Sequence, residues 1–127
     1  MPTRDKMTEE QFNMWQRGYR ATRLSLSDSI LVLKKSMNEI APDEQAEPRF
    51  QISLQEDKVR RLDTDLFLLN AGHITIDPPS PDVVQKLEAF ATQADKLIGQ
   101  AKATVQAVQL ADQAVSLYHS AVKPVAA

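Results

Sequence analysis

The segment PDVVQKLEAFATQADKLIGQAKATVQAVQLADQAVSLYHSAV, residues 81–122, repeats apolar residues at a spacing of seven, and its fold determines how the rest of the chain can pack. Such a repeat is typical of an amphipathic helix that is buried along its length. Ser80, Pro81 and Asp82 favour a helix start, because they supply a hydroxyl cap, a proline at the first helical position and an acid near the positive end of the helix dipole. The rows at this spacing are Leu87, Ala94, Ala101, Val108, Val115 and Val122, then Val83, Phe90, Leu97, Thr104, Ala111 and Tyr118, then Val84, Ala91, Ile98 and Val105. The sequence therefore predicts one long helix over about 81–122.

A second long helix is predicted near the N-terminus. Thr8 and Gln11 have the spacing of a capping box, in which each residue satisfies a free amide of the other. The pair Ala41–Pro42 would end this helix, because a residue before proline is pushed out of the α region. The predicted helix covers about 9–41.

A shorter helix is predicted between the two long ones. Ser53 and Glu56 form a second capping box, and Gly72 is placed to end the helix, which gives a helix over about 54–71. The preceding residues, 42–52, combine three acids with two prolines and an alternating end, and are predicted to form an acidic, extended linker.

These elements predict a single domain of the all-α class, a three-helix antiparallel bundle over residues 1–127. The remaining segments are an N-terminal tail (1–7), a proline-rich connector (72–80) and a C-terminal tail (123–127).

The predicted helices differ greatly in length, at about 63 Å, 50 Å and 27 Å for a rise of about 1.5 Å per residue. The short helix would leave much of the long ones uncovered, yet Lys102 and Asp112 are the only full charges between Leu97 and Val122. A surface so poor in charge predicts burial against a second copy of the chain, with a dimer favoured. The alternative is a kink at Gly99, which would fold 81–122 into two helices and cover the excess within one chain.

Composition narrows the classes of function. The 127 residues carry a formal charge of -2, no cysteine and three glycines that are far apart. Disulfides, thiol catalysis and cysteine-bound metals are therefore excluded, as are glycine-rich phosphate loops. The chain shows no signal-peptide pattern and no apolar run of about 20 residues, so we expect a cytoplasmic protein without a membrane span.

The sequence offers no pattern of catalytic residues. His73 and His119 are the only imidazoles and lie on different predicted elements, without a second ligand at helical spacing. The carboxylates fall at helix starts, in the linker or opposite arginines, where a solvated surface explains them. We therefore expect no enzyme, no metal, no cofactor and no small-molecule substrate.

Arg17, Arg20 and Arg23 form a possible cationic ridge on the first helix, beside Trp15 and Tyr19. Arginine interleaved with aromatic residues is typical of proteins that bind single-stranded nucleic acid. Against this, the aromatic residues belong to the predicted core, and the six acids of residues 38–57 would repel phosphate. A nucleic-acid-associated regulator is accordingly the alternative function.

The connector NAGHITIDPPSPD, residues 70–82, contains an alternation around Ile74 and Ile76 that can pack or pair as a strand. The only alternating segment elsewhere, Arg49–Ile52, would lie about 27 Å away at the far end of the short helix. We therefore expect the two isoleucines to pack onto the long helices, with β-pairing to another chain as the alternative.

The predicted function is a non-enzymatic helical protein–protein interaction module, such as an adaptor or chaperone-like protein, that binds itself and a protein partner. The candidate interaction residues are Arg17, Arg20, Arg23, Ile74, Ile76, Val105, Val108, Val115 and Tyr118.

Overall fold

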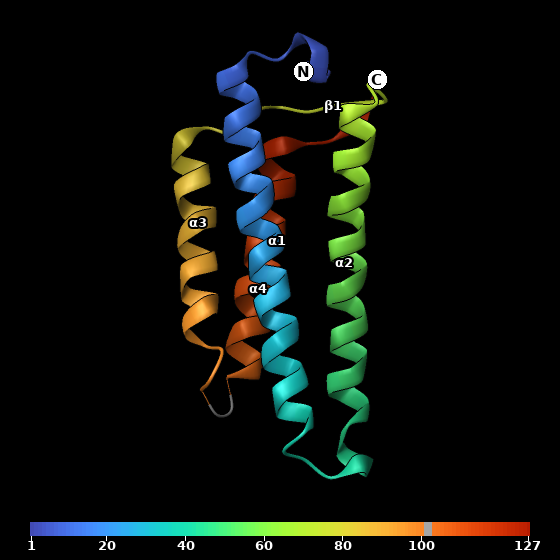
Figure 1. Ribbon diagram of the computed structural model, residues 1–127, viewed down its shortest axis with the longest axis vertical. Helices are drawn as coiled ribbons and strands as arrows, with labels where there is room; N and C mark the ends of the chain where they lie inside the picture. The colour runs from blue at the N-terminus through green and yellow to red at the C-terminus, as the bar shows by residue number, and fades with distance from the viewer. Residues whose placement is uncertain (101–102) are drawn as a thin grey trace.

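The computed structural model describes residues 1–100 and 103–127, and over these residues the chain forms an all-α bundle of four α-helices lying side by side (Figure 1). The helices are α1 (Glu9–Met37), α2 (Ala46–Asn70), α3 (Pro81–Lys96) and α4 (Thr104–Val122). Short elements complete the chain: the 3-10 turns η1 (Arg4–Lys6) and η2 (Pro42–Glu44), and the strands β1 (Ile74–Thr75) and β2 (Val125–Ala126). The all-α class is thus confirmed.

The single helix predicted over 81–122 is wrong, because the segment is a helical hairpin with its turn near Gly99, as in the alternative prediction. The N–H groups of Leu97 and Ile98, just after α3, donate to carbonyls three residues back, and the helix ends at Lys96. The reversal also closes a small apolar cluster of Val32, Leu97, Ala103 and Ala107. Part of the charge-poor surface is therefore covered inside one chain, whereas Val105 stays 67% exposed. Ala101 and Lys102 lie outside the described residues.

The predicted bounds of the other two helices also need correction. The first helix ends at Met37 rather than at residue 41, and α2 begins at Ala46 rather than at residue 54. Pro48 lies in the first turn of α2, where its missing N–H leaves no hydrogen bond unmade. The segment 49–52, predicted to be extended, is therefore helical, and α2 is long enough to run beside α1.

The connector 72–80 lies between the two ends of the chain (Figure 1). β1 pairs antiparallel with β2, so that Ile74 lies opposite Ala126. Ile76, the residue that follows β1, donates its N–H to the Pro2 carbonyl at 3.2 Å. Ile74 and Ile76 are both buried in the core, which confirms that they pack. The intrachain strand partner, which we predicted could only be Arg49–Ile52, is instead the C-terminal tail.

Small side chains allow α1 to approach its neighbours closely. A Cβ added to Gly18 would lie 3.3 Å from Leu87 Cδ1 of α3, so this glycine permits the α1–α3 approach. Small residues are buried on α1 (Thr22, Ser25, Ser29) and on α4 (Ala107, Ala111, Ala114). Since α1 packs closely on α2, α3 and α4, it is the central helix of the bundle.

Lys123, which caps α4, has a left-handed backbone conformation with φ 46° and ψ 62°. A side chain is disfavoured there, so replacing Lys123 by glycine is expected to raise the free energy of unfolding by about 0.5–1 kcal/mol. Urea titration followed by far-UV circular dichroism measures the change. Gly72, at φ 78°, is the matched control, because Gly72→Ala should lower stability. A Lys123→Gly variant less stable than the parent would contradict the strain.

Candidate binding surface between α2 and α4

α2 is held to α1 by a polar cluster beside the core. Asp63 of α2 accepts from the Tyr19 hydroxyl at 2.5 Å and from Arg23 Nε at 2.9 Å. The Arg23 guanidinium lowers the pKa of the Asp63 carboxyl, and burial together with that carboxylate raises the pKa of Tyr19 to about 12. These bonds fix one side of α2 against α1.

The other side of α2 faces α4 more loosely. Within the described residues, α2 and α4 are not one of the helix pairs that pack closely along their backbones. They are bridged by Asp112 of α4, which accepts from Lys58 Nζ at 2.5 Å and from Gln55 Nε2 at 3.3 Å. We call this bridge the Asp112 contact. It separates two hollows between the helices: a lower one near the starts of α2 and α4, and an upper one near their ends.

The lower hollow, which we call the α2–α4 groove, has a volume of about 310 Å³ and a mainly apolar lining. Leu33 of α1 contributes its apolar side chain, and the flanking helices contribute Pro48 of α2 and Val105 and Val108 of α4. The polar lining residues are Ser36, Glu47, Gln51, Thr104 and Gln109. Val105 is 67% exposed, so the groove presents apolar surface to solvent.

Leu54 extends this apolar surface along α2. It lies in one stripe with Glu47, Gln51 and Lys58, because residues spaced by three or four share a helix face. Since Gln51 lines the groove and Lys58 binds Asp112, the intervening Leu54 faces the same seam. Its side chain is 37% exposed.

The upper hollow is lined mostly by polar residues. It measures about 300 Å³ and is lined by Arg61, Thr64, Asp65, His119 and Pro124. Burial raises the pKa of the Asp65 carboxyl, and the nearby His119 opposes that rise. His119 thus belongs to a surface hollow with one carboxylate beside it, and His73 is exposed in the connector.

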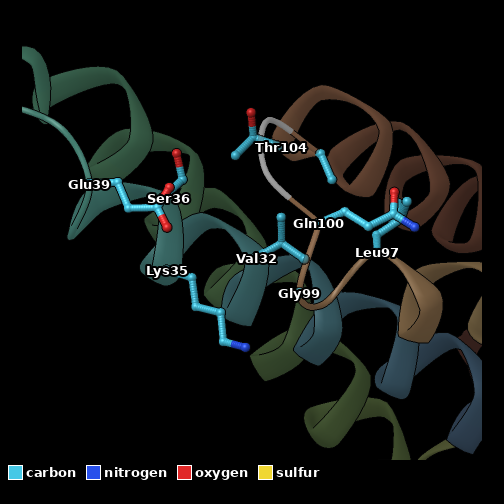
Figure 2. A pocket seen from close by; sticks show the side chains of 9 residues that line it. Val32, Lys35, Ser36, Glu39, Leu97, Gly99, Gln100 and Thr104 are labelled. Atoms are coloured by element: carbon cyan, nitrogen blue, oxygen red, sulfur yellow. The ribbon is translucent and has the colours of Figure 1, made fainter.

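A third hollow lies beside the α3–α4 turn (Figure 2). It measures about 250 Å³ and combines the apolar Val32 and Leu97 with Lys35 and Glu39. Ser36 and Thr104 line this hollow as well as the α2–α4 groove, so the two hollows adjoin.

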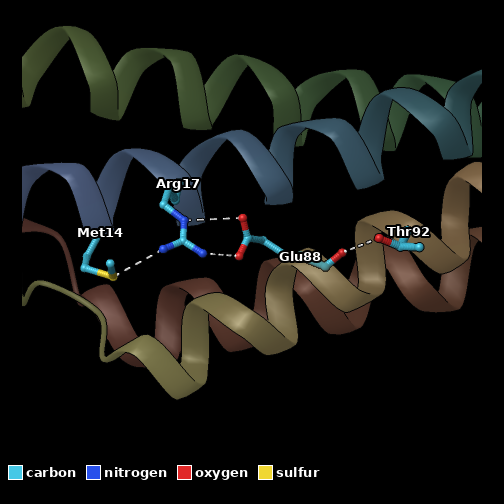
Figure 3. A network of polar contacts seen from close by, with 4 residues as sticks. All are labelled: Met14, Arg17, Glu88 and Thr92. Carbon is cyan, nitrogen blue, oxygen red and sulfur yellow. Dashed lines mark hydrogen bonds and ion pairs between the residues drawn. The ribbon is translucent and has the colours of Figure 1, made fainter.

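Two of the three arginines predicted to form one ridge on α1 contact different neighbouring helices. Arg17 pairs with Glu88 of α3 (Figure 3). Its Nη2 lies 2.5 Å from Glu88 Oε1, and this partner raises the pKa of Arg17. Arg23 pairs with Asp63 of α2, while Arg20 is exposed. Two of the three charges are therefore paired with carboxylates at the surface, where they link α1 to α3 and to α2.

Of the other predicted interaction residues, the structure brings Val105 and Val108 together in the groove. Tyr118 is fully buried and accepts a hydrogen bond from Trp15 Nε1 at 3.0 Å, and Val115 packs partly buried against the same core. Leu33 and Pro48, which line the groove, and Leu54, which lies next to it on α2, are not among the residues predicted from the sequence. The sequence predicts an extended linker over 42–52, whereas Leu54 shares a helix face with Gln51 only because α2 begins at Ala46.

Asp28 is a buried carboxylate on α1. Burial, and to a lesser extent the carboxylate of Asp95 on α3, raise its pKa. The neutral acid is thus favoured in the folded state, and the stability it contributes is lost as pH rises from the unfolded pKa of about 3.9 through the folded pKa. Asp28→Asn is therefore expected to raise the unfolding midpoint at pH 7 but not at pH 3. Thermal unfolding at both pH values tests this, and the exposed Asp95→Asn should give a smaller gain. An equal gain at both pH values would contradict the role of ionisation.

Comparison of the chain with protein-family models, with curated proteins and with solved structures gives no match. In the part of the chain that the structure describes, no helix has both the length and the apolar character needed to cross a membrane. Across residues 1–100 and 103–127, no three His, Asp or Glu side chains lie together as metal ligands would.

Proposed function

We propose that this protein is a non-enzymatic helical interaction module that holds a protein partner in the α2–α4 groove. The observation that carries the proposal is an apolar hollow of about 310 Å³ with the 67% exposed Val105 at its edge. Exposed apolar surface next to a concave, polar-edged hollow is typical of sites that bind other molecules. Val108, Leu33 and Pro48 would contact the partner inside the groove.

Self-association has less support than partner binding. The prediction rests on one long helix with an uncovered charge-poor face, and the turn near Gly99 folds part of that face onto the same chain. Sedimentation equilibrium measures the oligomeric state directly.

Nucleic-acid binding by the arginine ridge likewise has less support. The ion pairs of Arg17 and Arg23 place these residues in helix–helix contacts, which reduces the cationic charge left for phosphate. Heparin retention that falls steeply with salt would favour the regulator instead.

Cross-linking through an introduced cysteine tests this function. Because the sequence contains no cysteine, only the introduced residue is labelled. Val105→Cys carries a benzophenone maleimide at the groove, and Ala89→Cys, an exposed position on α3, carries the same group as a control. After irradiation in an extract of the native cell, we expect a discrete adduct from position 105 that unlabelled parent protein suppresses. Identical adducts from both positions, or none from position 105, would count against the groove.

A further inference from the structure

The α2–α4 groove has the shape of a seat for one helix face. Its walls are two helices that run in the same direction, with the stripe Glu47–Gln51–Leu54 on one side and Val105–Val108 on the other. From Glu47 to Leu54 the stripe is about 10 Å long at a rise of about 1.5 Å per residue, which matches two turns of a docked helix. The Asp112 contact closes one end of the groove, and the other end is open.

The open end of the groove is acidic. Glu47, in the first turn of α2, lines the groove, and Asp43 and Glu44 precede it in the 3-10 turn η2; all three are exposed. The ion pairs among the described residues leave these three carboxylates out. Glu47 accepts a hydrogen bond from Gln51 Nε2 at 3.2 Å, and the nearby Arg49 donates to Gln45. The edge of an apolar groove therefore carries three carboxylates that take part in no ion pair of the described residues.

This charge selects among the possible occupants. Two copies that paired groove to groove about a two-fold axis parallel to the helices would bring the same three carboxylates together, which like-charge repulsion opposes. A copy that docked its exposed Leu24 and Leu31 of α1 into the groove would leave its own groove free, so the association would not close. A helix of a different protein, with positive charge beside its apolar row, would meet neither like-charge repulsion nor open-ended association.

We propose that the α2–α4 groove binds one amphipathic helix of a partner protein, with lysine or arginine flanking its apolar row. This inference rests on the proposed function and specifies the chemistry of the partner. The apolar row would lie over Leu54, Val105 and Val108, and the flanking cations would face Asp43, Glu44 and Glu47.

The test uses two fluorescein-labelled amphipathic 14-residue peptides with the same leucine row, one flanked by lysine and the other by glutamate. Binding is measured by fluorescence anisotropy at low and moderate salt. We expect the lysine peptide to bind at least ten-fold more tightly than the glutamate peptide, with a preference that shrinks as salt screens the charges. Equal binding of the two peptides would overturn the proposed charge selection.

Two double variants separate the groove from general apolar surface. Leu54→Gln with Val105→Gln removes the exposed apolar side chains of the groove and should weaken lysine-peptide binding at least ten-fold. Leu24→Gln with Leu31→Gln removes side chains that are 50% and 46% exposed on the outer face of α1, and should leave binding unchanged. Equal losses from both double variants would overturn the site.

A third variant tests the acidic edge. Asp43→Asn, Glu44→Gln and Glu47→Gln together should abolish the preference for the lysine peptide, and an unchanged preference would overturn the role of these carboxylates. Since all the changed residues are at the surface, far-UV circular dichroism of each variant should match the parent.

Two further outcomes identify what has failed. A position-105 adduct without a preference for the lysine peptide would support the interaction module and overturn only the proposal that the partner helix is basic. A dimer in sedimentation that the Leu54→Gln, Val105→Gln variant loses would identify a second copy as the occupant and overturn the proposed partner.

Discussion

Replacing Trp15 by alanine is expected to lower the free energy of unfolding by about 3–5 kcal/mol, the range for truncating a buried large aromatic residue. Trp15 is fully buried, its ring centroid lies 5.4 Å from that of Tyr19, and its Nε1 donates to the Tyr118 hydroxyl at 3.0 Å. The substitution thus removes packing within α1 and the hydrogen bond from α1 to α4, and it leaves a cavity in the main core cluster.

The measurement is urea unfolding followed by far-UV circular dichroism, because Trp15 is the only tryptophan and its fluorescence is lost in the variant. Tyr118→Phe is the informative companion, since it keeps the ring but leaves the Trp15 N–H without its partner, at a cost of about 1–3 kcal/mol. A loss below about 1 kcal/mol for Trp15→Ala would show that this contact does not hold α1 and α4 together.

Replacing Ile76 by alanine is expected to lower the free energy of unfolding by about 2–5 kcal/mol, although the residue lies in a connector rather than in a helix. Its side chain is 1% exposed and belongs to the main core cluster, and its N–H donates to Pro2. Truncation therefore creates a cavity at the end of the bundle where both chain ends are bound.

The same urea titration measures this loss. His73→Ala, in the same connector, is the control, because His73 is exposed and should change stability by no more than about 0.5 kcal/mol. Equal effects of the two substitutions would mean that the connector contributes through its backbone alone and that Ile76 does not act as a core residue.

Local signals predicted the helix starts where a cap was present. Thr8 and Gln11 form the expected capping box, and Ser80 caps α3. The pair Ser53 and Glu56 has the same spacing but lies inside α2, since Ala46 and Pro48 begin the helix a full two turns earlier. A capping box in sequence thus indicates where a helix can begin, and tertiary packing determines whether it does.

The turn near Gly99 could not be located from periodicity. The spacing of seven continues through the turn, because α3 and α4 both face the core and their apolar rows stay in phase. Whether such rows form one rod or two packed helices depends on contacts such as that of Val32 with the α3–α4 turn, which involve residues far apart in sequence. Local sequence therefore left both possibilities open.

The arginine ridge illustrates a similar limit for the candidate sites. Residues at i and i+6 on a helix are separated by about 120° around its axis, so Arg17 and Arg23 point to different neighbours. Glu88 and Asp63, which receive them, lie on α3 and α2 and have no sequence signal that links them to α1. The groove had a similar outcome, since Val105 and Val108 were identified but their partner Leu33 was not.

The pairing of β1 with β2 also has a kinetic consequence. It joins residues 74–75 to residues 125–126, and Ile76 to Pro2, whereas the α3–α4 hairpin needs only neighbouring segments. Closing such long loops costs more chain entropy before any contact is gained. We expect the helical hairpins to assemble first and the chain ends to join last. Because that late step fixes three separate segments at once, it would make local opening of either end depend on the other.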